Sequence, residues 1–217
     1  MATETDPKEL LQKYVADLHS LLEHGRKAIS RQADQLKGGS QTEAHMAVVE
    51  FKQTLERQEI AVEKRLKSLG GSASSPIQDG AGAIAGAVTG VYNAMRSEEA
   101  SKSIRDDYTF FSHVAIASLM LYTSAKALRD EETAQLAQAI YKESAICVER
   151  IDVIMPKIVL DDLRDDGFTV LNVTDDSHRI IRDAWTGSTD ANPALRSNSA
   201  EGNQQTSMSK GQSQSIH

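Results

Sequence analysis

The stretch LMLYTSAKALRDEETAQLAQAI, residues 119 to 140, joins two helical patterns through the short acidic junction DEET at 130 to 133. Apolar residues recur on both sides of this junction at the three- and four-residue spacing of an α-helix. The sequence therefore predicts two long helices joined by a tight turn. The first begins near Ser97, and Pro156 should kink or end the second because proline removes an internal hydrogen bond. The predicted inner stripes are Ile104, Tyr108, Phe111, Ala115, Leu119 and Tyr122, and then Leu136, Ile140, Ser144, Cys147, Val148, Ile151 and Met155.

A similar pair of helices is predicted upstream of this one. Asp6 and Pro7 suit a helix start, since aspartate caps free amides and proline fits the first helical position. This pattern runs to Leu36, and the spacing of Ser40 and Glu43 is that of a capping box at the start of the next helix. The second pattern ends at glycines 70 and 71, so the two helices should form a long antiparallel hairpin. The inner stripes are Leu11, Tyr14, Leu18, Leu22, Gly25 and Ile29, and then Ala44, Val48, Phe51, Leu55, Val62, Leu66 and Leu69.

Small apolar residues dominate the segment between the two hairpins, residues 76–95. Gly82, Gly86 and Gly90 recur every four residues, which on a helix leaves a groove where another helix can approach closely. Packing against the bundle, contact with a second subunit and association with a membrane surface through residues 77–95 are all open. The membrane alternative is the weakest, because the apolar part falls short of the ~20 residues that span a bilayer.

The bundle is predicted to cover residues 6–166, followed by a short appended segment at 167–186. FTVLNV (168–173) is a candidate strand or extended segment, and DDSHRIIRDAW (175–185) a short amphipathic helix. Ile180, Ile181 and Trp185 on that helix are candidate contact residues. Residues 187–217 contain almost no apolar side chains, so we expect this tail to be disordered.

Composition excludes several classes of function. The formal net charge is −7, and no face rich in lysine and arginine is visible, so we expect no nucleic-acid partner. Cys147 is the only cysteine, which rules out an internal disulfide and favours a reducing compartment. The N-terminal residues lack the layout of a signal peptide, and we therefore expect a cytoplasmic protein.

Two long hairpins joined by a crossover are the connectivity of ferritin-like four-helix bundles. The segments HVAIAS (113–118), ALRDEE (127–132), LAQAIYKE (136–143) and FKQTLE (51–56) resemble the YciE/YciF-type ferritin-like proteins of bacteria, and Ala28-Ile29 fits the same family's first hairpin. The resemblance covers roughly residues 8–160. It implies an all-α ferritin-like bundle and a stress-associated protein, some relatives having a di-metal site. The family's acids fall here on Leu22, Ser112, Ala115, Ser144 and Val148.

Helix geometry gives a second test of a metal site. A di-iron or di-manganese centre needs about six carboxylates or imidazoles pointing inward from facing helices. At ~100° per residue, Glu59 falls inward beside Gln58, Glu143 lies at the edge of its stripe, and Glu56 looks solvated. Glu59 and Gln58 are then a remnant of a site, or a polar spot hydrogen-bonded to Tyr108, Tyr122 or Ser144. His24 and His113 point away from their inner stripes, and His19 lies at a flank.

The sequence thus favours a non-catalytic ferritin-like protein without a cofactor. It is expected to act by self-association, as a dimer, or by partner binding, with Gly82, Gly86, Gly90, Ile180, Ile181 and Trp185 as candidate contacts. The alternative is an iron- or manganese-dependent oxidoreductase that uses Glu59, Glu143 and Glu56. Cys147 is expected to be an inert core residue, since nothing nearby in the sequence would lower its pKa.

Overall fold

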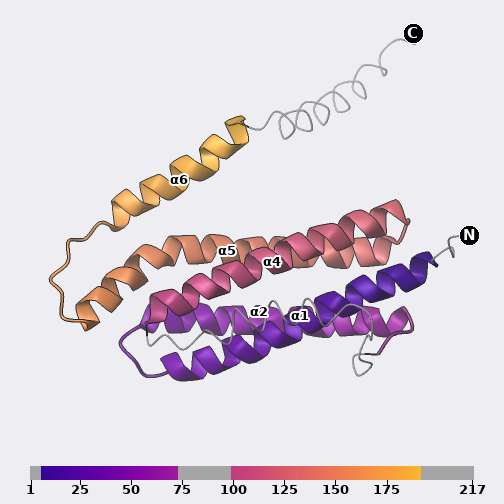
Figure 1. Cartoon of the computed structure of the whole chain (residues 1–217), viewed down its shortest axis with the longest axis horizontal. Coiled ribbons are helices and arrows are strands. Elements are labelled where there is room, and N and C mark those ends of the chain that lie inside the picture. The colour runs from indigo at the N-terminus through magenta and orange to yellow at the C-terminus, as the bar shows by residue number, and fades with distance from the viewer. Residues whose placement is uncertain (1–5, 73–98, 192–217) are drawn as a thin grey trace, which may run out of the picture. The chain divides into compact units, whose positions relative to one another are not determined.

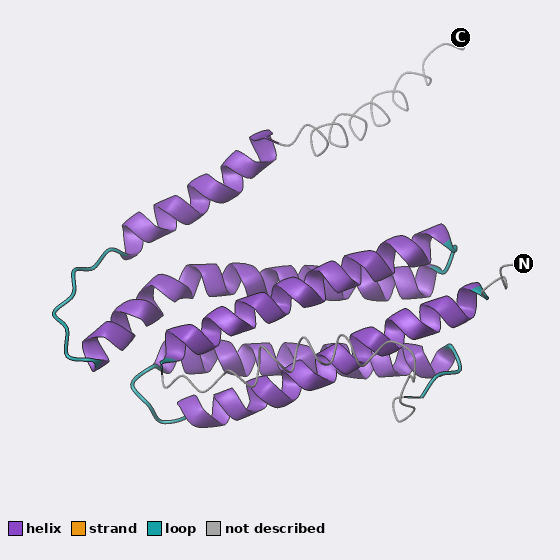
Figure 2. Ribbon diagram, viewed as in Figure 1, coloured by secondary structure: helices purple, strands orange, loops and turns teal. Residues whose placement is uncertain are grey.

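The computed structural model describes residues 6–72 and 99–191, which form five helices and contain no strand (Figures 1 and 2). The helices are α1 (Pro7–Leu36), α2 (Thr42–Ser68), α4 (Ala100–Ala127), α5 (Glu131–Asp165) and α6 (Thr174–Ala191). The chain divides into two compact units, residues 1–170 and 171–217. The first unit holds a bundle of two helical hairpins, and α6 belongs to the second.

The first hairpin has the ends that its sequence predicts. The Asp6 carboxylate accepts a hydrogen bond of 3.0 Å from the backbone amide of Lys8, which satisfies one free amide at the start of α1. Gly38 follows α1 with a φ of +80°, a left-handed conformation that costs glycine little. The chain therefore turns within a few residues, and α2 returns along α1.

The predicted capping box at the start of α2 is wrong. Gln41 occupies the N-cap position and makes no capping hydrogen bond. The Ser40 hydroxyl instead donates to the Asp165 carboxylate across the bundle at 2.8 Å, and Glu43 lies 3.6 Å from Lys157. Both side chains are used to join the two hairpins, which leaves neither for the cap.

The second hairpin closes at the predicted acidic junction. Asp130 is the N-cap of α5, and its carboxylate accepts a 3.0 Å hydrogen bond from the Thr133 amide. Helix α5 passes through Pro156 and ends only at Asp165, so the helix does not end at the proline. Proline removes one hydrogen bond, but Ile154 and Ile158 on either side are 1% and 0% exposed, and their burial holds this turn on the core.

Each hairpin packs on the other through two pairs of helices. Helix α1 contacts α2 and α4, and α5 contacts α4 and α2, whereas α2 and α4 lie diagonally and barely touch. Gly25 on α1 meets the ring of Phe110 on α4, and the rings of Phe51 and Phe111 meet edge to face at 5.1 Å. One continuous apolar core therefore runs through all four helices.

The inner stripes of α1 and α2 are largely confirmed, but that of α4 is wrong in part. Leu22, Phe51 and Leu55 are fully buried, as predicted. On α4, Leu119 is 40% exposed and Ala115 only half-buried, whereas Val114 and Ser118 are fully buried. Because α4 carries apolar residues over more than half of its circumference, periodicity alone does not identify the side that faces the core.

Helix α6 confirms the predicted amphipathic helix and extends beyond it. It ends at Ala191, so the helix enters the segment after Gly187 that was predicted to be disordered. Residues 168–173 contain no strand and are an irregular connection. Across the described helices, no segment has both the length and the apolar character needed to cross a bilayer. The small-residue segment at 76–95 and its three glycines lie wholly outside the described residues.

Candidate functional site

Glu59 lies on the flank between α1 and α2 rather than in the core. Its carboxylate accepts hydrogen bonds from the Arg26 guanidinium of α1, and its side chain is 17% exposed. The ion pair raises the pKa of Arg26 through the hydrogen bond to Glu59. An acid held by a guanidinium is engaged in joining two helices, and its charge is already balanced.

Gln58, and not Glu59, is the polar residue of α2 that enters the core. Its side chain is 2% exposed, and its amide nitrogen donates a 3.0 Å hydrogen bond to the Glu143 carboxylate of α5. Ser144, the residue after Glu143, is fully buried. Neither the Ser144 hydroxyl nor the Gln58 carbonyl oxygen has a hydrogen-bond partner among the described residues. Helices α2 and α5 are therefore linked by a neutral amide and a half-buried acid.

The remaining candidate donors do not converge on this pair. Glu56 is half-buried on α2, His24 is exposed on α1, and His113 is half-buried on the side of α4 that faces α1. His19 is buried, with 7% of its surface exposed. Within residues 6–72 and 99–191, no three side chains from His, Cys, Asp and Glu come close enough together to hold a metal ion.

The donor set of the described helices thus does not fit a di-metal centre. Such a centre needs about six inward ligands. The core has Leu22 and Ser144 at two positions where the family resemblance would place acids, and the neutral Gln58 in place of an inward acid on α2. Glu59 is engaged by Arg26 and Glu143 by Gln58. The expectation of a protein without a cofactor stays a prediction, and so does its alternative, an iron- or manganese-dependent oxidoreductase.

Asp107 is the acid that sequence reasoning missed. It is fully buried on α4, and no hydrogen bond of ordinary geometry reaches either carboxylate oxygen from the described residues. Burial raises its pKa well above the ordinary value, and the side chain of Gln32 on α1 lowers it by less. Asp107 lies three residues after Ile104 and four before Phe111, a spacing that places it on the buried stripe. That spacing is the signal that could have revealed it.

Cys147 has the environment expected of a core residue. It is 6% exposed, and burial raises the pKa of its thiol to about 12, with a further contribution from the nearby Glu143 carboxylate. A thiol with such a pKa is almost entirely protonated at neutral pH and is a poor nucleophile. This agrees with the expectation that Cys147 is inert.

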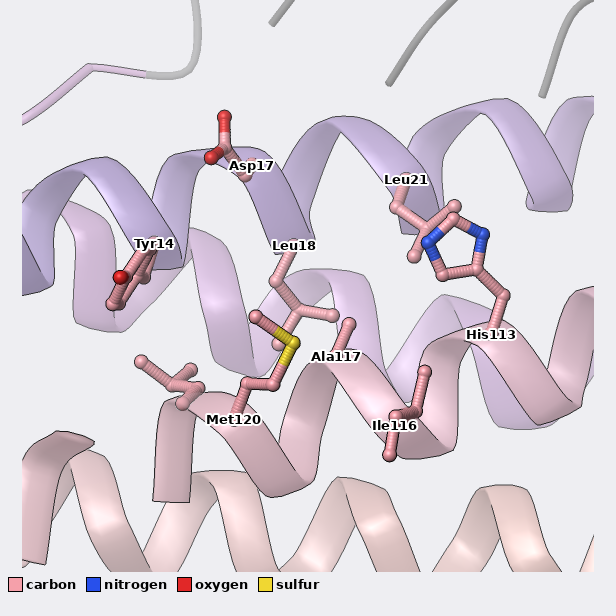
Figure 3. Close-up of a pocket in the computed structure, with 9 residues that line it drawn as sticks. Tyr14, Asp17, Leu18, Leu21, His113, Ile116, Ala117 and Met120 are labelled. Atoms are coloured by element: carbon pink, nitrogen blue, oxygen red, sulfur yellow. The ribbon is translucent and has the colours of Figure 1, made fainter. Parts of the chain in front are cut away.

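Two apolar regions on the outside of the bundle are the other features of note. One is a cavity of about 270 Å³ between α1 and α4 (Figure 3). The other lies along the outer side of the α4–α5 pair, where Leu119 of α4 is 40% exposed and Tyr141 of α5 is 38% exposed. The cavity is lined by Tyr14, Asp17, Leu18, Leu21, His113, Ile116, Ala117, Met120 and Leu121.

The predicted contact residues of α6 are largely exposed. Ile180 and Trp185 are 69% and 56% exposed, and Ile181 is half-buried.

Comparison with known proteins supports the fold alone. No protein-family profile matches the chain, and no curated protein matches it. Among solved structures, the chain is similar to the protein XCC3681 from Xanthomonas campestris pv. campestris, with a TM-score of 0.60 and 18% sequence identity. The match covers 75% of this chain and 99% of that protein. The class that fold and similarity define is therefore an all-helical bundle with a bacterial structural neighbour.

Proposed function

We propose that this protein is a non-catalytic, ferritin-like helical-bundle protein that acts through association with a second copy of itself. The observation that carries this proposal is an apolar surface along the outer side of the α4–α5 pair. We call it the α4–α5 surface. It consists of Leu119 and Tyr141, which are exposed, and of Tyr122 and Val148, which are half-buried and also pack against the core. A role in a bacterial stress response follows from the family resemblance alone.

The exposed residues of the α4–α5 surface lie opposite one another. Tyr108 is close enough to Asp152 for that carboxylate to contribute to the rise in the tyrosine's pKa, after burial. Leu119 follows Tyr108 by about three helical turns on α4, and Tyr141 precedes Asp152 by about three turns on α5. Since the two helices are antiparallel neighbours, these steps bring Leu119 next to Tyr141.

Burial of this surface would stabilise a dimer. Transfer of a large apolar side chain from water to an interface stabilises by roughly 1.5–3 kcal/mol when burial is complete. Leu119 and Tyr141 are exposed by about two fifths, so each contributes a fraction of that value. In a two-fold dimer each residue is used twice, because the same surface is present on both subunits.

The mass of the protein in solution tests this proposal. We expect a dimer at tens of micromolar, and we expect Leu119→Glu to convert it to a monomer because the substitution places a charge in the apolar contact. Ile60→Glu is the matched control, since Ile60 is 68% exposed on α2, and it should leave the mass unchanged. Sedimentation velocity measures all three proteins. A wild-type monomer, or a dimer that survives Leu119→Glu, would contradict the proposal.

A further inference from the structure

The outer side of α4 carries no charge over about five turns. Between Asp107, which is buried, and Lys126, the helix contains no aspartate, glutamate, lysine or arginine. The side of a helix that faces water is normally its charged side, so this side of α4 has the character of a contact surface. Its exposed residues in this stretch are Thr109, Ile116, Leu119, Met120 and Thr123.

These five residues form a single stripe. At ~100° per residue, the other four all lie within about 60° of Ile116 around the helix. Ile116 and Met120 are 53% and 59% exposed. The hydroxyls of Thr109 and Thr123 donate to backbone carbonyls of α4 one turn earlier, at 3.4 and 2.9 Å. Burial of the two threonines would therefore leave no hydroxyl donor unpaired.

The stripe is also symmetric about Ile116. Thr109 and Thr123 lie seven residues before and after it, about two helical turns on either side. When two such stripes meet antiparallel at Ile116, isoleucine faces isoleucine and each threonine faces a threonine. A stripe that matches its own reverse favours a second copy of this chain as the partner, because a two-fold dimer uses the same patch on both subunits.

The charges at the two ends of the stripe are balanced within the chain. Arg105 pairs with Asp106 at 2.8 Å, and Lys126 pairs with Glu131 at 2.6 Å. The apolar centre is therefore bounded by ion pairs rather than by single charges that would repel a second copy. An apolar centre with a polar rim is the usual composition of a protein–protein interface.

The α4–α5 surface determines the direction in which two copies of α4 can pair. Leu119 lies on the side of the stripe next to Tyr141 of α5, and Met120 lies on the side that borders the cavity with α1 (Figure 3). In an antiparallel pair related by a two-fold axis, the α5 sides of the two copies meet. In a parallel pair, the α5 side of one copy meets the α1 side of the other. Only the antiparallel pair brings the α4–α5 surface against itself.

We propose that α4 pairs antiparallel with α4 of a second copy, with the two-fold axis at Ile116. The inference rests on the proposed dimer, since it states how the second copy is oriented and where the axis passes. It extends the contact from Leu119 across the outer side of α4 to Met120. The helices in such a pair are about 8–10 Å apart, so side chains from both stripes interlock.

Crosslinking of the full-length protein tests this orientation. In a Cys147→Ala background, Thr109→Cys and Thr123→Cys are made singly and together, and each protein is treated with a bis-maleimide. The reagent is chosen to be shorter than the roughly 21 Å that separates these positions along α4. The double variant should give at least roughly tenfold more covalent dimer than either single variant, because antiparallel pairing places position 109 beside position 123 of the other copy. Ile60→Cys, 68% exposed on α2, is the control and should give no covalent dimer.

A second variant tests the position of the axis. Ile116→Glu should raise the dissociation constant of the dimer at least roughly tenfold, because the two-fold axis places the new charge against its own copy. Ile60→Glu should leave the constant unchanged. An unchanged constant for Ile116→Glu would overturn the central position of Ile116, and circular dichroism verifies that each variant is folded.

Sedimentation velocity of the same samples separates failure of this inference from failure of the proposed function. Covalent dimers from each single variant would show that α4 pairs in parallel. A non-covalent dimer that gives no crosslink would show that the second copy lies elsewhere. Both results overturn the antiparallel pair and leave the proposed dimer standing, whereas a monomeric wild type overturns both.

Discussion

At the scale of single residues, Asp107 is the side chain with the clearest consequence for stability. Burial raises its pKa above the ordinary 3.8, so the folded protein keeps a proton that the unfolded chain releases. Its contribution to stability is therefore complete below pH 3.8 and is lost as the pH rises towards the raised folded value. Asp107→Asn should increase the free energy of unfolding at pH 7 by about 1–3 kcal/mol and add nothing near pH 3.5.

Urea unfolding of the wild type and the variant across this pH range measures the effect. Asp106→Asn is the control, since Asp106 is adjacent in sequence but pairs with Arg105 at 2.8 Å. That substitution should leave stability the same or slightly lower at pH 7, because it removes a surface ion pair. A gain for Asp106→Asn equal to that for Asp107→Asn would show that the effect is one of general charge and not of burial.

Residue-level prediction from the sequence succeeded or failed according to the neighbours of each side chain. Leu22 and Ser144 were placed correctly because apolar spacing alone determines the side they occupy. Glu59 was predicted to point inward, whereas Gln58, one position earlier, is the residue that enters the core. Adjacent residues differ by only ~100° on a helical wheel, so the wheel does not separate these two orientations. The ion pair with Arg26, which comes from the facing helix, draws Glu59 to the flank. No spacing within α2 encodes that partner.

At the scale of helices, the contact between α1 and α4 depends on the absence of a side chain at Gly25. A methyl group at this position would overlap the ring of Phe110, which is 4% exposed and packs on Phe111 with ring centroids 5.3 Å apart. Alanine gains about 1 kcal/mol in helix propensity, whereas overpacking a core costs about 1–3 kcal/mol. Gly25→Ala should therefore lower the free energy of unfolding by roughly 1 kcal/mol.

Chemical denaturation measures this change, and a double variant isolates its cause. Phe110→Leu alone should also be destabilising, because it leaves part of the core unfilled. Gly25→Ala combined with Phe110→Leu should be less destabilised than the sum of the two single effects, since the smaller side chain makes room for the methyl group. Additive effects would show that the cost of Gly25→Ala has another origin than the Phe110 ring.

The helix ends show which parts of an element the sequence encodes locally. Asp6 and Asp130 cap α1 and α5 as predicted, because a cap depends on residues within one turn. Ser40 was predicted to cap α2 but donates to Asp165, which is 125 positions away in the chain. A local motif is overridden here by a partner that only the tertiary fold supplies. The exposed side of α4 was mistaken for part of the core for a similar reason, because only the tertiary packing decides which apolar side of this helix is buried.

At the scale of the whole molecule, the bundle could be predicted and the contact surfaces only in part. Four long helices with short turns follow from periodicity, caps and glycines, and these determine an antiparallel pair of hairpins. The α4–α5 surface was hidden within the predicted inner stripe of α4, since Leu119 and Tyr122 have helical spacing with Phe111. Only the crossing of α4 over its neighbours decides which apolar side stays outside.

The division of the chain into two units allows the two candidate association surfaces to be separated. The α4–α5 surface belongs to the unit of residues 1–170, and Ile180, Ile181 and Trp185 belong to the other. Removal of residues 171–217 should leave the free energy of unfolding of the bundle within about 1 kcal/mol of the wild type, because the bundle core lies within the first unit. The truncated chain should also remain a dimer by sedimentation velocity.

The combination of this truncation with Leu119→Glu completes the test. If α6 supplies the contact, truncation yields a monomer whereas Leu119→Glu alone keeps the dimer, and the proposed surface is then wrong. If the α4–α5 surface supplies it, the opposite pattern results. A truncated chain that fails to fold would contradict the division into separate units, because the bundle would then need residues beyond its own core. Mass and unfolding measured on the same samples distinguish these outcomes.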